Sequence, residues 1–294
     1  AVRHGTVASV SDPHEIANVL GEHGVRFMLD NAAQSPFHFL FGAPSCVPAT
    51  PFESAGAVLD AAAVARLLDL PQIGYLSEMM NFPGVLNGDA QVLAKLNAAK
   101  QRGLPVDGHA PGLKGDGARA YAAAGISTDH ECYSLEEAHD KLAAGMHVLI
   151  REGSAARNFD TLQPLIGTHA TQLMFCSDDK HPDDLAHGHI NQLVARAVAL
   201  GHDLFDVLQI ACRNPLQHYG LPLGQLRVGD AFDAIIVSDL QQFQVSATYL
   251  GGVLAAQNGQ TLLPAVEFSP INHFAAEPIR REQLLVSAVS DEVR

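Results

Sequence analysis

The chain has 294 residues, of which 47% are hydrophobic and 17% are charged; this balance is typical of a folded protein with a large core and excludes an intrinsically disordered chain. Its formal net charge is -14, with 18 Lys and Arg against 32 Asp and Glu, so a polyanion would be repelled and we expect no nucleic-acid partner. No apolar run is as long as a membrane span and residues 1–20 lack the layout of a signal peptide, so we expect a cytoplasmic protein that binds no membrane.

Strand-like runs alternate with amphipathic stretches from Thr6 to Leu200. The predicted strands are Thr6–Val10, Phe37–Phe41, Ile73–Ser77, Leu104–Asp107, Ile126–Asp129, His147–Ile150 and Leu173–Cys176. The predicted helices are Glu15–Leu29, Asp89–Gln101, Leu135–Ala144 and Leu185–Leu200, the third opened by a capping box of Ser134 and Glu137. This alternation predicts an α/β fold, a TIM-like (β/α)8 barrel lacking its first strand, because seven strands are visible and we expect the eighth upstream of residue 1. The alternative is an open, doubly wound sheet of seven strands.

The pattern changes at Gly224, where shorter strand-like runs replace the alternation. Residues 224–264 are predicted to form part of a small β-sandwich, with Asn258 and Gly259 in a hairpin turn. We therefore divide the chain into a barrel, truncated at its N-terminus, at 1–223, the sandwich segment at 224–264, and a linker at 265–294 that leads toward an absent C-terminal domain.

Metal-capable side chains follow four of the predicted strands, at the point where each strand ends. They are Glu78, His109, His130 and Asp178. In a parallel barrel all these strand ends meet on one face, so the pattern predicts a metal site there. For Glu78 the alternative is a salt bridge to a buried arginine such as Arg151, and a single histidine among the 15 of this chain would be weak evidence.

Other polar residues at the strand ends are candidates for catalysis or for substrate binding. Asp12 suits the N-cap of the first helix, while His14 suits a contact with the substrate or with a metal ligand. One of the adjacent Asp178 and Asp179 can bind metal while the other moves a proton. The string at 151–158 carries Arg, Glu and Ser, which can bind the polar edge of a heterocycle or simply brace a loop. No nucleotide-phosphate loop, nucleophile elbow or His-Glu-x-x-His helix is present in the sequence.

Several longer strings occur in order along the chain. They are Asp-Pro-His-Glu-Ile-Ala-Asn-Val (12–19), Ser-Cys-Val-Pro-Ala (45–49), Glu-Met-Met-Asn-Phe-Pro-Gly-Val (78–85), Asp-Gly-His-Ala-Pro-Gly-Leu (107–113), His-Glu (130–131), Arg-Glu-Gly-Ser-Ala-Ala-Arg-Asn (151–158) and Ser-Asp-Asp (177–179). In these strings, which span about residues 1–260, the chain resembles the bacterial adenine deaminases of the amidohydrolase superfamily. The resemblance implies a (β/α) barrel with a small β-sandwich and a binuclear metal centre. In that centre Glu78 bridges two ions, His109 and His130 bind one of them, and Asp178 binds the other.

The resemblance also implies the reaction, a metal-dependent hydrolysis of adenine to hypoxanthine and ammonia in purine salvage. Its cofactors are two divalent ions, Mn²⁺ or Fe²⁺ first and Zn²⁺ as a further option, which make water nucleophilic near neutral pH. Asp178 is our first candidate for taking the proton of that water, with Glu131, Asp179 or His14 as alternatives. The candidates for purine recognition are His14, Arg151, Glu152 and Ser154. We expect the protein to form a homo-oligomer, a dimer. Its other expected partner is the small-molecule substrate adenine.

One feature of the family is missing from this sequence. A His-x-His pair on the first barrel strand binds the second metal in the family, and nothing before Thr6 supplies it. Alone, the segment is therefore expected to bind metal poorly. Two alternatives stay open: another reaction of the superfamily, such as cyclic amide hydrolysis, and an inactive, metal-poor fragment that acts only as a folding or interaction unit. Glu78 favours deamination over cyclic amide hydrolysis, because cyclic amidases of the superfamily typically carry a modified lysine at that strand end.

Overall fold

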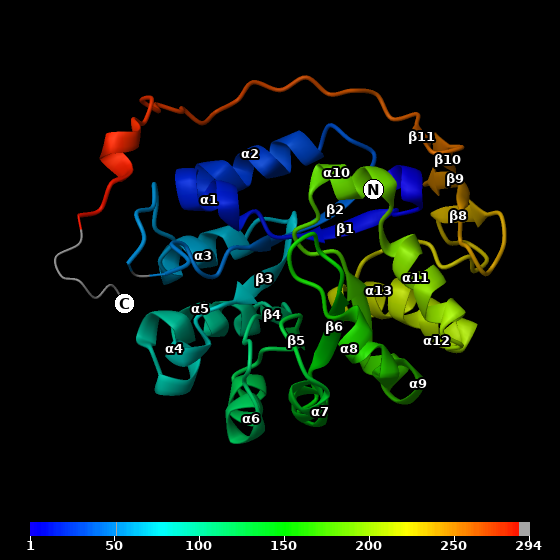
Figure 1. Ribbon diagram of the computed structural model, residues 1–294, viewed down its shortest axis with the longest axis horizontal. Coiled ribbons are helices and arrows are strands. Elements are labelled where there is room, and N and C mark those ends of the chain that lie inside the picture. The colour runs from blue at the N-terminus through cyan, green and yellow to red at the C-terminus, as the bar shows by residue number, and fades with distance from the viewer. Residues whose placement is uncertain (51, 288–294) are drawn as a thin grey trace.

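A computed structural model describes residues 1–50 and 52–287, and within these residues seven parallel strands form two adjoining sheets (Figure 1). Their order is β1-β2-β3-β4 in one sheet and β5-β6-β7 in the other. The strands are β1 Ala8–Ser11, β2 His38–Ala43, β3 Ile73–Met79, β4 Val106–Gly108, β5 Thr128–Asp129, β6 His147–Arg151 and β7 Leu173–Cys176. The Ser127 amide donates to the Val106 carbonyl at 2.9 Å, which continues the first sheet into the second. The strands therefore form a curled, parallel half-barrel, and all seven predicted strands are confirmed.

Helices connect the parallel strands and cover the outside of the curl (Figure 1). They are α1 His14–Leu20, α2 Glu22–Ala32, α3 Ala61–Leu68, α4 Phe82–Asn87, α5 Ala90–Gln101, α6 Gly115–Ala123, α7 Leu135–Ala143, α8 Phe159–Leu162, α9 Ile166–His169, α10 Pro182–His187, α11 Ile190–Ala199, α12 Leu204–Leu208 and α13 Asn214–Tyr219. Short 3₁₀ turns are η1 Val2–His4, η2 Gln163–Leu165, η3 Ala170–Gln172 and η5 Arg281–Leu284, and η4 Gln209–Arg213 is a π-helical turn. The predicted helices at Asp89–Gln101 and Leu135–Ala144 are confirmed as α5 and α7.

Two predicted helices were wrong, because each is broken in the structure. The segment Glu15–Leu29 bends at Gly21, which has φ 59° and separates α1 from α2. Positive φ is accessible to glycine at little cost, so the chain turns there while its apolar periodicity continues. The segment Leu185–Leu200 is interrupted by extended backbone at 188–189, where α10 ends and α11 has yet to begin.

The predicted capping box of α7 is only half formed. Ser134 accepts from the Glu137 amide at 3.2 Å, as an N-cap residue should. The second hydrogen bond of the box would run from the Ser134 amide to the Glu137 carboxylate. That carboxylate accepts from the Tyr133 amide and from Lys141 instead. Glu137 is nearly inaccessible to solvent, so its carboxylate belongs to the interior rather than to the helix surface.

Two apolar clusters lie between the sheets and their covering helices. One includes Leu67 and Leu76 and joins α3 and α5 to the first sheet. The other includes Ile150 and Leu193 and joins α7, α8 and α11 to the second sheet. Burial of each such leucine or isoleucine side chain stabilises the fold by about 1.5–3 kcal/mol. The strands are thereby fixed from outside the curl, and their C-terminal ends are left to carry polar groups.

After the parallel strands the chain forms an antiparallel sheet of order β11-β10-β9-β8. Its strands are β8 Ala234–Val237, β9 Val245–Leu250, β10 Val253–Gln257 and β11 Gln260–Thr261. The predicted turn at Asn258 and Gly259 is confirmed, since both residues have positive φ, 49° and 76°. Beyond this sheet the described chain passes over α1 and α2 (Figure 1), and Phe268 packs edge-on against Phe27 at 6.0 Å between ring centroids.

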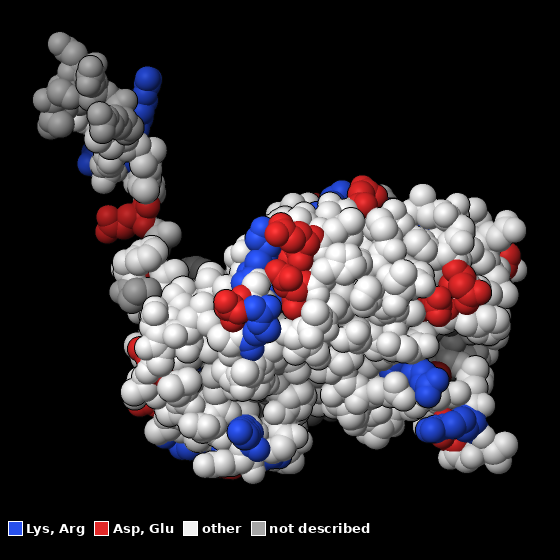
Figure 2. Space-filling view, turned by 90° about the horizontal axis from the view of Figure 1, so that it is seen from below, with Lys and Arg blue, Asp and Glu red and all other residues white. Residues whose placement is uncertain are grey.

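Charged side chains are sparse on the face shown in Figure 2, where lysine and arginine lie in small groups beside acidic residues. Examples of such pairing in the molecule are Lys114 with Glu136 at 2.7 Å and Arg102 with Asp69 at 2.7 Å. Among the helices of the described residues, none combines the length and the hydrophobicity needed to span a bilayer.

Candidate metal centre

The carboxylate of Glu78 lies at the centre of the polar strand ends. One of its oxygens, Oε2, is 2.8 Å from His109 Nδ1 and 3.1 Å from His130 Nε2. The three side chains come from the ends of β3, β4 and β5, and their donor atoms all lie within 4.8 Å of one another. Two imidazoles and a carboxylate oxygen form a donor set that suits a divalent transition metal.

The second oxygen of Glu78 faces a different group. Glu78 Oε1 is 3.6 Å from Nδ1 of His14, and the same nitrogen is 2.8 Å from Asp12 Oδ2. Asp12, His14 and Glu78 form a second group whose donor atoms are close enough for one ion. Each oxygen of the Glu78 carboxylate thus faces its own set of ligands, which is the arrangement of a carboxylate between two cation sites.

The charges in this cluster are strongly coupled. Burial would raise the pKa of Glu78, but hydrogen bonds with His109 and His130 lower it well below its usual range, so the carboxylate is ionised. Burial would likewise lower the pKa of His130, but its hydrogen bond with Glu78 raises it to about 9. For His14, hydrogen bonds with Asp12 and Glu15 outweigh burial and raise the pKa to about 11. The anionic cluster therefore favours bound positive charge, whether as protons or as a metal ion.

A buried guanidinium connects the centre to the end of β7. Arg151 Nη1 and Nη2 donate to the two oxygens of Glu131 at 2.5 and 3.0 Å, and Nη1 also donates to Asp178 Oδ2 at 2.8 Å. Glu131 Oε1 in turn lies 3.6 Å from His109 Nδ1 and 3.5 Å from His130 Nε2. Arg151 thus holds two of the predicted catalytic carboxylates in place. It does not pair with Glu78 as the alternative interpretation of that glutamate required.

Neighbouring groups fix the backbone around Glu78 and His109. Ser45 Oγ donates to the Glu78 carbonyl at 2.5 Å. Tyr121, on α6, donates its hydroxyl to the Met79 carbonyl at 2.6 Å and accepts from the His109 amide at 3.1 Å. One buried tyrosine therefore links the end of β3 to the turn after β4 and sets the spacing of two candidate ligands.

The remaining predicted site residues lie around the loop after β6. Glu152 pairs with Arg196 of α11 at 2.7 Å, and Ser154 donates to Asp184 at 2.5 Å. The Asp179 carbonyl accepts from the Ser154 amide at 3.0 Å, which ties this loop to the end of β7. Burial and the nearby Asp178 carboxylate raise the pKa of Asp179. The structure thus gives Glu152 and Ser154 partners within the protein, while their contact with a substrate stays a prediction.

Sequence reasoning gave Asp12 a different role and overlooked Asp107. Asp12 does not cap α1, whose N-cap is Pro13; its carboxylate faces His14. Asp107 accepts from Tyr219 at 2.8 Å and from Thr128 at 2.9 Å, and burial raises its pKa to about 7. The available signal was its place near the end of β4, two residues before His109.

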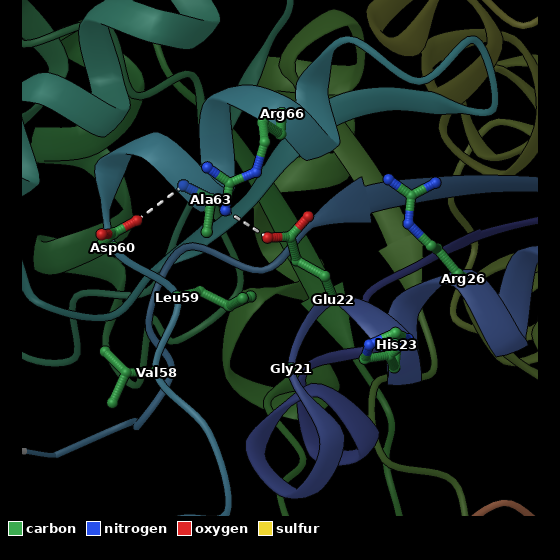
Figure 3. A pocket seen from close by; sticks show the side chains of 9 residues that line it. All are labelled: Gly21, Glu22, His23, Arg26, Val58, Leu59, Asp60, Ala63 and Arg66. Atoms are coloured by element: carbon green, nitrogen blue, oxygen red, sulfur yellow. Dashed lines mark hydrogen bonds and ion pairs between the residues drawn. The ribbon is translucent and has the colours of Figure 1, made fainter.

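A separate hollow of about 400 Å³ shares no residue with this centre (Figure 3). Its lining consists of Gly21, Glu22, His23, Arg26, Val58, Leu59, Asp60, Ala63 and Arg66. Arg66 is paired with Glu22 at 2.5 Å, and Asp60 accepts from the Ala63 amide as the N-cap of α3. These charges serve the packing of α2 and α3, so we place no function there.

Comparison with known proteins adds independent information. The sequence profile of the Amidohydrolase family matches residues 1–255. An adenine deaminase of Salinibacter ruber is 57% identical over 294 residues, which is 100% of this chain and 54% of that protein. Adenine deaminases of Borreliella burgdorferi and Methanosarcina mazei are 51% and 52% identical, each over 93% of this chain and over 51% and 50% of the relative. The chain thus spans about half the length of the curated relatives it matches.

Solved structures with low sequence identity share the fold. A β-aspartyl dipeptidase of Fervidobacterium islandicum AW-1 superposes with a TM-score of 0.61 at 13% identity and covers 91% of this chain and 77% of its own. An N-isopropylammelide isopropylaminohydrolase of Burkholderia multivorans gives a TM-score of 0.61 at 16% identity, with 89% and 74% covered. At these identities the likeness concerns architecture alone.

Proposed function

The chain belongs to the amidohydrolase family, and from that premise we propose that it forms most of the catalytic barrel of an adenine deaminase, which hydrolyses adenine to hypoxanthine and ammonia. The curled strands then belong to a (β/α)8 barrel, and residues 224–264 to a small β-sandwich beside it. The observation that carries the chemistry is the Glu78 carboxylate, whose two oxygens face separate groups of ligands. Identity of 50–57% to adenine deaminases supports adenine as the substrate.

The donor set fits the divalent ions that the family implies. Glu78, His109 and His130 would hold one ion, and Glu78 would take part in holding the other, for which Asp12 and His14 lie in reach of Glu78. Asp178 belongs to neither of these groups in the structure, where it accepts from Arg151, and we propose that it joins the second ion when that ion is bound. Imidazole and carboxylate ligands suit Mn²⁺ and Fe²⁺, which we favour, and also Zn²⁺. When bound, such ions lower the pKa of water and so supply a nucleophile near neutral pH.

The chain's own residues must then move protons. Hydrolysis removes a proton from water, adds the oxygen to C6 of adenine, and returns a proton to the leaving amino group as ammonia. Burial opposes ionisation of Glu131, but hydrogen bonds from Arg151 lower its pKa, so this carboxylate is in the form that accepts a proton. Asp178 shares the same arginine, and we propose Asp178 as the first proton acceptor with Glu131 as the alternative.

The purine would lie against the strand ends that carry His14 and Asp179. His14 Nδ1 is paired with Asp12, and Nε2 would donate to a purine ring nitrogen in place of its contact with Glu15 at 3.2 Å. Arg151 has a buried guanidinium that donates to two carboxylates, so we assign it to holding those carboxylates rather than to the base. Glu152 and Ser154 would act by shaping the loop beside the base.

The test uses the natural protein that carries this chain, loaded with Mn²⁺ or Fe²⁺. Adenine consumption is followed by ultraviolet absorbance, and ammonia release is measured in parallel. We expect hypoxanthine and ammonia in equal amounts. Absence of hypoxanthine at full metal occupancy would overturn the proposal, and turnover of a cyclic amide instead would assign the protein to a different reaction of the family.

A further inference from the structure

A buried charge cluster lies beneath the two turns that carry His109 and His130. It consists of Asp129, Glu137 and Lys141, whose side chains are 0%, 3% and 0% exposed. Lys141 Nζ lies 2.9 Å from Asp129 Oδ1 and 2.9 Å from Glu137 Oε1. Charged groups at this depth are costly unless they are fully paired, so their presence calls for an explanation.

Asp129 connects the two histidine-bearing turns directly. Its Oδ2 accepts from the Ala110 amide at 2.9 Å, and its Oδ1 accepts from the Glu131 amide at 2.8 Å. Ala110 is the residue after His109, and Glu131 is the residue after His130. One carboxylate therefore fixes the backbone next to both candidate ligands, one on each of the two parallel sheets.

Glu137 and Lys141 of α7 complete the cluster from below. Glu137 accepts from the Gly112 amide at 2.8 Å on one oxygen and from the Tyr133 amide at 3.0 Å on the other. Lys141 donates to the Ala110 carbonyl at 2.7 Å. Glu137 thus links both turns to α7, and Lys141 adds a further link from α7 to the turn after His109.

This cluster is not itself a metal site, although donor atoms of Asp129, Cys132 and Glu137 come within 4.8 Å of one another. The Lys141 ammonium already lies beside both carboxylates and supplies the positive charge. The Lys141 ammonium thus takes the place that a metal ion would have between Asp129 and Glu137.

We propose that Asp129, Glu137 and Lys141 are positioning residues that set the separation and orientation of the His109 and His130 imidazoles for a shared ion. The inference rests on the metal centre of the proposed function and gives it a specific support. Groups that orient ligands in this way typically contribute 10- to 100-fold to metal affinity or activity. None of the three needs to touch the substrate.

The test compares Glu137→Gln and Lys141→Met with Asn214→Ala, all made in the natural protein. Asn214 is a matched control because it is also buried and braces two carbonyls, those of Ala170 and Leu173, away from the histidine turns. Metal affinity is measured by chelator competition with Co²⁺, together with the visible absorption of bound Co²⁺. In the metal-free protein, hydrogen exchange is measured at the amides of Ala110, Gly112 and Glu131.

We expect Glu137→Gln to weaken Co²⁺ affinity about 10-fold, to shift the Co²⁺ absorption, and to speed exchange at the turn amides. Lys141→Met should have larger effects on all three measurements. Asn214→Ala should lower the unfolding temperature while its Co²⁺ affinity stays within about twofold of the parent's. If Lys141→Met does not fold, Glu137→Gln decides, because it keeps the side-chain size. Unchanged affinity and absorption in Glu137→Gln would overturn the inference and leave a role in stability alone.

These readouts need no substrate, so they separate this inference from the reaction. A parent protein that binds Co²⁺ but releases no hypoxanthine contradicts only the proposed substrate, and the comparison of variants still stands. A parent protein that binds no Co²⁺ at all overturns the positioning role, because there is then no shared ion to position.

Discussion

Arg151 connects two carboxylates that come from different strand ends, and only 3% of its side chain is exposed. Replacing it by methionine would leave Glu131 buried without its counter-charge. Losing one partner of a buried ion pair costs about 3–5 kcal/mol, so we expect Arg151→Met to lower the free energy of unfolding by that amount. Arg151→Lys should recover only part of it, since a lysine cannot donate to both oxygens in the same geometry.

Urea unfolding followed by circular dichroism measures these differences. Arg157→Met is the matched control, because Arg157 is largely exposed and lies 3.8 Å from Glu152, a pair expected to contribute less than about 1 kcal/mol. Equal stability of Arg151→Met and Arg157→Met would show that the buried pairing contributes nothing.

Glu78 is the residue on which both candidate ion sites depend. Gln keeps the size of the side chain but replaces one acceptor oxygen by a donor, so Glu78→Gln should abolish both metal retention after dialysis and adenine turnover. Metal content by emission spectroscopy and hypoxanthine formation are the measurements. Glu53→Gln, at an exposed carboxylate that accepts from the Ala49 amide, should change neither. Metal content and turnover at the parent's level would remove Glu78 from the centre.

Strand-end position was enough to bring Glu78, His109 and His130 together from the sequence, because parallel strands expose their C-terminal ends on one side. The pairing of Arg151 with Glu131 and Asp178 could not be predicted in the same way. It depends on which rotamers place long side chains within hydrogen-bond reach of each other, and periodicity carries no such information. Sequence patterns thus locate a site better than they assign partners within it.

Gly108 of β4 lies directly against the backbone of β5. A Cβ there would lie 2.3 Å from the Thr128 carbonyl oxygen, a backbone atom that cannot move alone. We expect Gly108→Ala to force the two strands apart, to cost about 1–3 kcal/mol of stability, and to weaken metal binding by moving His109 relative to His130. Thermal unfolding and chelator competition measure both effects.

Gly167 of α9 provides the matched control, because a Cβ added there would meet no other atom of the described residues within 4 Å and its φ is not positive. Gly167→Ala should stabilise the protein by about 0.4–1 kcal/mol, since it restricts the unfolded chain without a clash. A Gly108→Ala variant that behaves like Gly167→Ala would show that the strands tolerate the separation.

The contact of His218 on α13 with His147 at the start of β6 introduces a dependence of stability on pH. Burial and the neighbouring His147 lower the pKa of His218 to about 4, and its Nε2 lies 3.2 Å from Ser127 Oγ. The folded state therefore favours neutral His218, while the unfolded chain takes up a proton near pH 6.5. Stability from this residue is complete above that pH and is lost as the pH falls from about 6.5 toward 4.

Comparing the parent with His218→Gln isolates this contribution from the other titrating groups. The free energy of unfolding, measured from about pH 7.5 to about pH 4, should fall less steeply in the variant. Parallel pH profiles would mean that His218 titrates alike in both states.

Among the elements, α/β alternation was readable because each strand and helix buries its own apolar pattern. The breaks at Gly21 and at 188–189 were not, because the apolar periodicity continues across them. Periodicity reports which side chains are buried, whereas helix continuity depends on backbone dihedrals. The contact of the antiparallel sheet with the N-terminal turn was also hidden: Thr248 donates to the Val2 carbonyl at 2.8 Å across 246 positions, and no local signal encodes such a pairing.

At the scale of the whole molecule, the candidate centre lies where the two sheets and their separate apolar clusters meet. Glu78 and His109 belong to the sheet of β1–β4, whereas His130 follows β5 of the other sheet. Hydrogen bonds of the Glu78 carboxylate and the cluster around Asp129 join the two halves of the curl. An ion shared by Glu78, His109 and His130 would add a further link between them.

Metal removal should therefore lower global stability rather than the stability of one loop. A ligand that binds only the folded state stabilises it by about 2.7 kcal/mol when its free concentration is about 100 times its Kd. We expect the unfolding temperature of the natural protein to fall when the metal is chelated and to return when Mn²⁺ is added. Glu78→Gln should show no such shift, because it retains neither site. Hydrogen exchange should rise after chelation in β3 and in β6 alike, since the ion couples both sheets; a rise confined to the turns after β4 and β5 would show that the ion orders only its own ligands.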